Sequence, residues 1–395
     1  MDTLSAQRRP GTARDAVAGV VPSEVIRPAD ETEVVAIMRE ARARQQTVVP
    51  VGAGTKTGWA APPSRADLLL DLTGLDRIVE HTAGDLVVIA QVGVRIEQLG
   101  EQLAGAGQAL ALDPPERGAT LGGIVSANSS GPRRLRYGTA RDLLIGVTVV
   151  LADGTLAHSG GKVVKNVAGY DLGKLYTGAH GSLGVVVSTT WRLHPRAAAT
   201  AVVTLDLPEA AAAGPLALAL ARSTLTPTAV ELLGSAGGGG RLVVLFEAIA
   251  ESVAAQAKTA TELLGGGTIT EQLPAGFGQR PGAPTDLLLR LAFAPAALPA
   301  VLAALPAGTT ITCSACSGIA YAALPAAEGV SALGRLRSEI AGHDGTAVVL
   351  GVPDEFRAGL DHWGPIGNSM ELMRKVKHRF DPERRLSPGR FVGGM

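Results

Sequence analysis

The sequence predicts an α+β protein with more than one domain, and three observations lead to that prediction. Short strands rich in Val, Ile and Leu alternate with amphipathic helices over the first 195 residues. Three glycine-rich clusters interrupt this alternation, at residues 47–58, 111–131 and 165–187. After His194-Pro195 the composition shifts toward Ala, Gly and Pro, and a second set of strands and helices begins. With 395 residues and 46% hydrophobic content, the chain is long enough for two or three domains.

The first expected helix lies within residues 22–46. Asp30 is the expected N-cap, and Glu33 follows three residues later, as in a capping box. Apolar residues from Val34 to Ala41 recur at helical spacing and would cover a sheet. A β-branched strand at 47–51 then leads into the first glycine cluster.

Several short strands and one more helix are expected before residue 195. The strands are predicted at 68–72, 77–81, 86–92 and 145–151, and a helix at 94–104. Asp153-Gly154 follows the last of these strands and is a strong hairpin signal.

The later part of the chain predicts an α+β cap over one antiparallel sheet. Its expected strands and helices alternate along the chain. The strands are predicted at 201–207, 241–246, 287–293 and 347–351, and the helices at 253–264, 298–305 and 331–340.

Charge and hydropathy exclude some classes of function. The 36 Lys and Arg residues equal the 36 Asp and Glu residues, so no overall field favours nucleic acid. The start of the chain has no apolar stretch of a secretory signal, and no apolar run approaches the ~20 residues that cross a membrane. A cytoplasmic protein is therefore expected.

The first glycine cluster, G-A-G-T-K-T-G at 52–58, presents consecutive backbone amides after a strand. Such amides form an anion nest suited to a pyrophosphate. The spacing is not that of a Walker A loop, and no helical period follows it as in a Rossmann fold. Taken alone, the cluster is equally typical of a surface turn.

The three clusters together, in this order, resemble the PCMH-type FAD-binding domain, also called the vanillyl-alcohol oxidase type. The resemblance covers roughly residues 20–195 and the segment 372–391. The runs K-N-V-A-G-Y-D-L and R-Y-G-T-A-R-D make the chain similar to the FAD-binding subunits of bacterial glycolate oxidases. The resemblance implies two α+β subdomains around the flavin in residues 1–195, a substrate-side α+β cap in 196–360, and a return to the FAD domain in 361–395.

The resemblance also implies which residues contact FAD. One group would hold the pyrophosphate, a second would line the diphosphate and the isoalloxazine edge, and a third would contact the adenosine half. In that order the groups are Gly52, Ala53, Gly54, Thr55 and Lys56; Pro114, Thr120, Gly122, Gly123, Ala127 and Ser130; and Gly181, Gly184, Val185 and Val186.

Two departures from the family pattern bear on the cofactor. His180 stands where most relatives carry an acid, which leaves an acidic contact open while the backbone contacts need no carboxylate. Thr55 stands in the loop where covalent relatives carry a His. Non-covalent FAD is therefore predicted.

The implied activity is oxidation of glycolate to glyoxylate, with flavin N5 as hydride acceptor. Electrons would pass to a second flavin subunit and an iron–sulfur subunit of a glycolate oxidase complex, which could bring the chain to the inner face of the membrane. Two alternatives stay open: a self-sufficient FAD-dependent 2-hydroxy-acid dehydrogenase, and a non-catalytic assembly subunit. The two cysteines are too few for an iron–sulfur cluster, so electrons must leave to another acceptor or chain.

Oxidation of a 2-hydroxy acid requires a base for the hydroxyl proton and a cation for the carboxylate. The sequence identifies no base, because His343 and His362 are isolated. Arg290 interrupts an apolar strand and is the candidate for the carboxylate, the alternative being an edge residue that points to solvent. The basic group Arg133, Arg134, Arg136 and Arg141 is interpreted either as a solvated turn with ion pairs or as a contact near the flavin or an acidic partner.

Cys313 and Cys316 form a C-x-x-C pair without a second pair or a suitably spaced His. They lie where catalytic relatives carry a histidine-rich metal motif, H-x-G-x-G-N-x-H. The corresponding stretch of this chain, T-C-S-A-C-S-G-I-A-Y, contains no histidine. Two small buried residues and no metal site are predicted.

Overall fold

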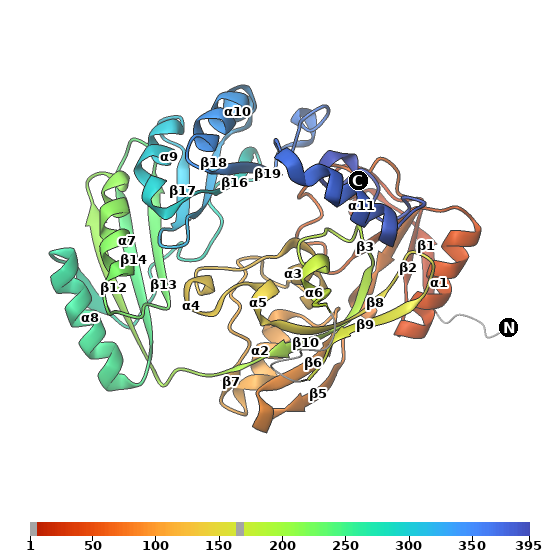
Figure 1. Cartoon of the computed structure of the whole chain (residues 1–395), viewed down its shortest axis with the longest axis horizontal. Helices are drawn as coiled ribbons and strands as arrows, with labels where there is room; N and C mark the ends of the chain where they lie inside the picture. Colours follow the sequence, from red (N-terminus) through yellow and green to blue (C-terminus); the bar gives the residue numbers. More distant parts are fainter. Residues whose placement is uncertain (1–5, 163–169) are drawn as a thin grey trace. The chain divides into compact units, whose positions relative to one another are not determined.

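The computed structural model describes residues 6–162 and 170–395, which belong to two compact units. The first unit contains Met1–Ser129, Thr139–Arg196 and Pro365–Met395 (Figure 1). The second contains Ser130–Gly138 and Ala197–Gly364. These units differ from the sequence-based division mainly at residues 130–138, which were expected within the FAD domain. Residues 165–169, the start of the second glycine cluster, lie outside the described part of the chain.

The first sheet of unit 1 has the strand order β1-β2-β4-β3. Strands β2 and β3 are parallel to β4, and β1 is antiparallel to β2. Helix α1 packs its apolar side against the sheet. The elements are β1 (Gln7–Pro10), β2 (Glu24–Arg27), α1 (Glu31–Ala43), β3 (Val48–Val51) and β4 (Leu68–Asp71).

Helix α1 begins where its capping residues require. Asp30 accepts a hydrogen bond from the amide of Glu33 at 2.9 Å, and the Glu33 carboxylate accepts one from the amide of Ala29 at 2.8 Å. The helix is shorter than the predicted range of 22–46 because residues 24–26 pair with β4 instead. Val25 and Ile26 are buried in β2. Asp30 is the N-cap of the helix that begins after this strand.

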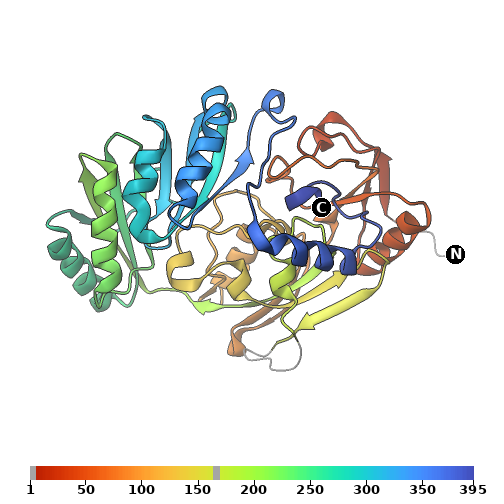
Figure 2. The same ribbon diagram turned by 45° about the horizontal axis from the view of Figure 1, so that its top comes forward.

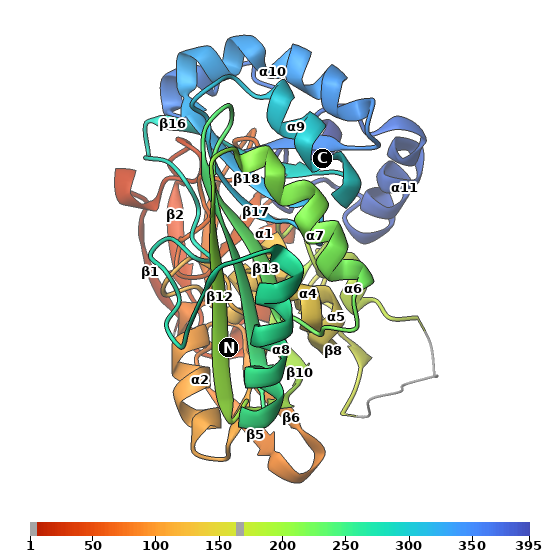
Figure 3. The same ribbon diagram turned by 90° about the vertical axis from the view of Figure 1, so that its left-hand side faces the viewer.

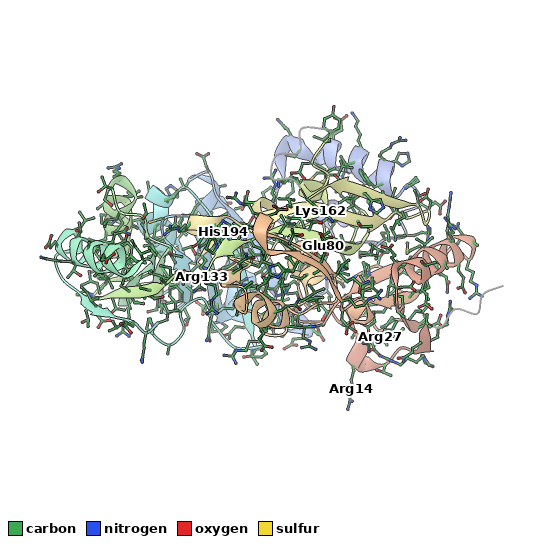
Figure 4. The ribbon with its side chains drawn as sticks, turned by 90° about the horizontal axis from the view of Figure 1, so that it is seen from below. Arg14, Arg27, Glu80, Arg133, Lys162 and His194 are labelled. Atoms are coloured by element: carbon green, nitrogen blue, oxygen red, sulfur yellow. The ribbon has the colours of Figure 1, made fainter. Side chains whose placement is uncertain are left out.

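The second sheet of unit 1 is antiparallel, with the order β5-β6-β10-β8-β9 (Figure 1). The predicted turn at Asp153-Gly154 joins β8 to β9, and Gly154 has a φ of 82°. Glu80 and Lys162, both labelled in Figure 4, form an ion pair at 2.5 Å. The strands are β5 (Ile78–Thr82), β6 (Val87–Gln91), β8 (Leu144–Val150), β9 (Leu156–Gly160) and β10 (Val185–Arg192).

Short helices and the C-terminal segment complete unit 1. The C-terminal segment returns to the first sheet through a parallel bridge between Val48 and Leu386. The remaining elements are α2 (Ile96–Ala104), α3 (Leu121–Ala127), α5 (Ala140–Leu143), α6 (Gly173–Tyr176), α11 (Met370–Phe380) and the strand pair β7 (Gln108–Ala109) and β11 (His194–Pro195). No helix among the described residues is long and apolar enough to span a membrane.

Unit 2 is built on one antiparallel sheet, as predicted, with the order β15-β12-β14-β13-β17-β18-β16-β19. The sequence reading missed β13, β15, β17, β18 and α7. The strands are β12 (Ala199–Leu207), β13 (Ala229–Ser235), β14 (Gly240–Ala248), β15 (Thr268–Thr270), β16 (Asp286–Ala292), β17 (Thr310–Ser314), β18 (Ile319–Pro325) and β19 (Thr346–Gly351).

Four helices cover one face of this sheet. Figure 2 shows them side by side, coloured green to blue, and Figure 3 shows α7, α8 and α9 on the same side of the long strands. Their buried residues form one core with alternate residues of the strands, among them Val244, Leu289 and Ala322. The helices are α7 (Ala213–Arg222), α8 (Ala250–Leu264), α9 (Leu298–Ala304) and α10 (Ala326–Ala341).

The opposite face of the sheet is covered differently. Phe277, from the loop between β15 and β16, packs there against Val202, Val243 and Leu245. Helix α4 (Arg134–Tyr137) also contacts this sheet, because Arg133 forms a bidentate ion pair with Glu247 at 2.7 and 3.0 Å. Arg133 is labelled in Figure 4. Arg136 also donates to the carbonyl of Glu247 at 3.2 Å, so residues 130–138 contact unit 2 at more than one point.

Candidate functional site

The loop after β3 presents unbonded backbone amides, as the first glycine cluster predicts. Among the described residues, the amides of Ala53, Gly54 and Thr55 donate no hydrogen bond. Gly54 has a φ of +75°, and a Cβ atom there would meet no atom within 4 Å. Three consecutive free amides around an open glycine are a suitable nest for an anion.

Most glycines around this loop are required by packing within the protein. A Cβ at Gly52 would lie 2.1 Å from Thr120 Oγ1, and one at Gly122 would lie 2.8 Å from Val92 Cβ. Gly184 is equally enclosed, since its Cβ would lie 2.5 Å from Val149 Cγ1. Gly123 differs, because its nearest neighbour would be Thr120 Oγ1 at 3.4 Å and it lines two pockets.

The first of these pockets is the more polar of the two and contains two cationic side chains. Lys56 lies 3.7 Å from the carboxylate of Glu116, which also accepts a hydrogen bond from Ser129 Oγ at 2.6 Å. Arg390, from the C-terminal segment, donates to the carbonyl of Trp59 at 2.8 Å. The pocket is lined by Val17, Val49 to Thr57, Thr120, Gly123, Ser126, Ala127, His180 and Arg390.

His180 lines this pocket as a neutral side chain. Burial lowers its pKa to about 3, and the nearby Arg390 lowers the pKa further in the same direction. The imidazole is therefore uncharged at neutral pH, although it stands where the family pattern has an acid. Its φ of 50° places it in the left-handed region, next to Gly181 with a φ of 70°.

The second pocket shares a wall with the first but is mainly apolar. Leu72, Val92 and Val186 line it, together with Tyr176. Burial raises the pKa of Tyr176 to about 12, so its hydroxyl stays protonated. Pro50, Val51, Gly52, Thr120, Gly123 and Ser126 belong to both pockets.

The two pockets together fit the chemistry of FAD. The apolar pocket lined by Leu72, Val92 and Val186 can accept the flat adenine ring. The adjacent amides and cations can hold a pyrophosphate, which needs hydrogen-bond donors and positive charge. The open positions at Gly54 and Gly123 are where a ligand can approach the backbone closely.

Most, but not all, of the residues expected to contact FAD line these pockets. Gly52 to Lys56, Thr120, Gly122, Gly123, Ala127, Gly181, Gly184 and Val186 do so. Val185 faces the other side of β10 and is buried in the core with Val34 and Ile37. Pro114 lines neither pocket, and Ser130 lies in unit 2.

The sequence reading missed some pocket residues. Arg390, Ser126, Val17 and Tyr176 were not singled out. The segment 372–391 was part of the resemblance, so Arg390 had a positional signal but no motif that marked its side chain. Val17 precedes the region of resemblance altogether.

Arg290, the candidate for a substrate carboxylate, lies in unit 2 on β16. This strand lies between β18 and β19, so Arg290 is not the edge residue of the alternative interpretation. Register places Arg290 opposite Tyr321, and Tyr321 opposite Thr312, on the sheet face away from the helices. A side-chain hydrogen bond joins Arg290 to Tyr321.

A small pocket in unit 2 lies beside Tyr321. It is lined by residues of the 130–138 segment, the loop 278–280 and the polar face of the sheet. These are Ser130, Gly131, Pro132, Arg134, Glu231, Gly278, Gln279, Arg280, Thr312, Ser314 and Tyr321. Arg134, treated in the sequence only as part of a basic group, thus lies near Arg290.

The remaining candidate residues lie elsewhere. Cys313 is buried in the core of unit 2, and Cys316 donates a hydrogen bond from its thiol to the carbonyl of Ala217 at 3.4 Å. His362 is buried, and burial lowers its pKa. Within the described ranges, no three His, Cys, Asp or Glu side chains are arranged to hold a metal.

Comparison with known proteins supports the FAD assignment. Residues 22–160 match the family described as FAD binding domain. FAD is the cofactor of the chain, and the α+β fold class expected for this type of domain is confirmed.

Relatives resemble part of the chain. A D-lactate dehydrogenase of Archaeoglobus fulgidus is 32% identical over 209 residues, 53% of this chain and 47% of that protein. Glycolate oxidase subunit GlcD of Bacillus subtilis is 34% identical over 177 residues, 45% of this chain and 38% of that protein. A D-2-hydroxyglutarate dehydrogenase of Xanthomonas citri is 32% identical over 188 residues, which are 47% of this chain and 40% of that protein. The chain thus spans less than half the length of these relatives.

The fold has counterparts among solved structures. Alkyldihydroxyacetonephosphate synthase superimposes with a TM-score of 0.70, covering 94% of this chain and 78% of that protein. At 15% identity this similarity concerns the fold alone.

Proposed function

We propose that the chain oxidises a small 2-hydroxy acid with FAD, with glycolate as the first substrate to test. The observation that carries the proposal is the shared chemistry of its partial relatives. They are named for D-lactate, glycolate and D-2-hydroxyglutarate, all of which carry a hydroxyl group beside a carboxylate. The common feature supports the substrate class more strongly than any one acid.

The residues of unit 1 have defined tasks in this proposal. The amides of 53–55 bind the pyrophosphate, and the charges of Lys56 and Arg390 offset its negative charge. The apolar pocket at Leu72 and Val186 shields the adenine from water. When bound, FAD supplies the acceptor for the hydride that leaves the hydroxyl-bearing carbon.

We further propose that the chain works as the FAD-binding subunit of a glycolate oxidase complex. The sequence contains two cysteines, too few to ligate an iron–sulfur cluster. Electrons must therefore leave to an acceptor or to other subunits, for which a second flavin subunit and an iron–sulfur subunit are the proposed partners. The partial match to a glycolate oxidase subunit supports this choice.

The second candidate is a dehydrogenase that needs no partner. The partial similarity to D-lactate and D-2-hydroxyglutarate dehydrogenases favours it. A third candidate is an assembly subunit with little flavin, against which the match at residues 22–160 argues.

One set of experiments separates these candidates. The purified chain is examined by absorption spectroscopy without oxygen, before and after addition of glycolate, D-lactate or D-2-hydroxyglutarate. Bleaching of the flavin by one acid supports oxidation, and turnover with an artificial electron acceptor by the chain alone supports a self-sufficient dehydrogenase. Flavin that none of the acids bleaches, in the chain or in a complex isolated with it, would contradict the proposed substrate class.

A further inference from the structure

Three arginines surround one tyrosine hydroxyl in unit 2, and we call Arg134, Arg280, Arg290 and Tyr321 the arginine pocket. Arg134 Nη2 lies 3.4 Å from Tyr321 Oη, and Arg280 Cζ lies 3.6 Å from the centroid of the Tyr321 ring. Arg290 is the cross-strand neighbour of Tyr321 in the register between β16 and β18. Three cationic groups are thus concentrated around a single buried side chain.

Each arginine comes from a different element. Arg290 projects from β16, which lies between β18 and the edge strand β19. Arg134 belongs to α4, which the ion pair between Arg133 and Glu247 anchors to the sheet. Its guanidinium also donates to the carbonyl of Ser130 at 2.7 Å.

Arg280 belongs to a loop with unusual backbone conformations. Gly276, Gly278 and Gly282 have φ values of 84°, 67° and 87°, which favour glycine over other residues. Gly278 lies against Pro132, so that a Cβ there would be 3.2 Å from Pro132 Cδ. The loop therefore contacts the segment that carries Arg134, and convergence of three elements indicates a built site.

Most of the charged groups at this site are cationic. Glu231, which accepts a hydrogen bond from Ser314 Oγ at 3.5 Å, is the carboxylate in the lining that the structure describes. The lining also contains the guanidinium groups of Arg134 and Arg280, and Arg290 lies beside Tyr321. Burial alone would raise the pKa of Tyr321, but Arg280, Arg134 and Arg290 outweigh burial and lower it. A cluster of partly buried cationic groups is stabilised by an anion.

A second observation indicates that a ligand donates or accepts a hydrogen bond here. Ser130 is buried with an exposed fraction of 1%, and it lines the pocket. Its Oγ has no hydrogen-bond partner within the described ranges. Buried hydroxyl groups are nearly always paired in folded proteins, by protein or by ligand atoms.

We propose that the arginine pocket binds the carboxylate of a small organic acid. A guanidinium presents paired N–H donors that match the two oxygens of a carboxylate, and Ser130 Oγ can supply a further hydrogen bond. The proposal rests on the proposed function, because the carboxylate would be that of the 2-hydroxy acid. It assigns the binding of this group to Arg134 and Arg280 together with Arg290.

The test measures binding directly, on the full chain with FAD bound. Calorimetry compares glycolate with glycolamide, its neutral amide, and with inorganic phosphate, the other source of oxyanion chemistry. Arg134→Gln and Arg280→Gln each remove one positive charge and leave β16, the strand that carries Arg290, unchanged. Arg241→Gln is the matched control, since Arg241 is a partly exposed arginine of unit 2 that pairs with Asp206 at 2.6 Å.

The expected result is that glycolate binds and glycolamide does not. Each of the two pocket variants weakens glycolate binding about tenfold or more, as for one lost charge-assisted hydrogen bond. The control variant stays within about twofold of the wild type. Because the ligand offsets the arginine charges, glycolate also raises the pKa of Tyr321, seen as a shift in the ultraviolet titration of tyrosinate that Tyr321→Phe abolishes.

Two outcomes would overturn the assignment. Glycolate binding that is unchanged in both pocket variants would place the carboxylate elsewhere, and phosphate binding tighter than any carboxylate would assign the pocket to a phosphorylated ligand. Failure of the proposed function is distinguishable. A further outcome is that no 2-hydroxy acid reduces the flavin while arginine-dependent carboxylate binding persists. In that case the assignment of the arginine pocket is supported and the proposed oxidation is contradicted.

Discussion

Lys377 Nζ lies 2.7 Å from Asp381 Oδ2, one turn further along the C-terminal segment, and both side chains are buried. The same ammonium donates to the carbonyls of Ser182 at 2.8 Å and Leu386 at 3.0 Å. Asp381 in turn accepts from the amide of Leu386 at 2.8 Å. The pair therefore joins α11 to the turn at 181–184, which forms a wall of the second, mainly apolar pocket.

Replacement of Lys377 by Met should destabilise unit 1 and weaken FAD retention. Removal of one partner leaves the Asp381 carboxylate buried without its counter-charge, which costs about 3–5 kcal/mol. Denaturant unfolding and flavin content per chain measure the two effects. Lys375→Met is the control, because Lys375 forms an exposed ion pair with Glu371 that contributes about 0–1 kcal/mol. Equal stability of the two variants would show that the buried pair does not hold the turn.

Gly123→Val should abolish FAD retention while the protein stays folded. Gly123 lines both pockets, and its Cβ would meet a protein atom no closer than 3.4 Å, so the added side chain would occupy ligand space. Gly122→Val should instead destabilise the fold, since its Cβ would lie 2.8 Å from Val92 Cβ. Flavin absorbance and thermal unfolding separate the effects. Gly100→Ala, at a position with no atom within 4 Å of the new Cβ, should change neither.

His180 should make the FAD-binding unit less stable in acid. Its pKa is about 3 in the folded protein and near 6.5 in the unfolded chain, so the unfolded chain binds more protons between these values. The stability due to the neutral imidazole is present above about pH 6.5 and is lost as pH falls toward 3. His180→Gln removes the titrating group. Its free energy of unfolding should fall less steeply over this range than that of the wild type, and parallel curves would contradict the prediction.

FAD should be released when the protein is denatured. Thr55 stands in the loop where covalent relatives carry a His, and His180 is the histidine that lines the polar pocket. Acid precipitation should leave a colourless pellet and a yellow supernatant. A yellow pellet would show a covalent bond, and its loss in His180→Gln would identify the attachment point.

The glycine clusters made much of the lining of the two pockets predictable, because close approach of the backbone is visible as residue type. Gly52 to Lys56 and Thr120 were identified in this way. Arg390 was not, since it reaches the site from the far end of the chain and donates to the carbonyl of Trp59 by tertiary contact. Sequence patterns predict local conformation, but they do not predict the tertiary contacts of a long side chain.

Arg290 shows the same limit in unit 2. A charged residue in an apolar strand is compatible with an edge position or with a buried site, and the choice depends on strand order. The sequence reading missed β17 and β18, so Arg290 had no visible neighbour. Once β18 pairs with β16, Tyr321 lies opposite Arg290, and the arginine faces a polar partner rather than solvent.

Cys313 and Cys316 should be dispensable for flavin binding and oxidation. Burial raises the pKa of Cys313 well above its ordinary value and that of Cys316 to about 11, so both are uncharged thiols at neutral pH. An uncharged thiol is a poor nucleophile and a poor metal ligand. A Cys313→Ser, Cys316→Ser variant should keep its flavin and lose roughly 1 kcal/mol of stability per site.

The single variants should differ in stability for a structural reason. A serine at 316 can keep the hydrogen bond to the carbonyl of Ala217, whereas a serine at 313 lies in the apolar core of unit 2. Cys313→Ser should therefore cost more than Cys316→Ser, and Cys313→Ala, which adds no hydroxyl group, serves as the control. Denaturant unfolding, flavin content and metal analysis of each variant are the measurements. Stoichiometric zinc or iron in the wild type, lost with activity in the double variant, would show that the cysteines hold a metal.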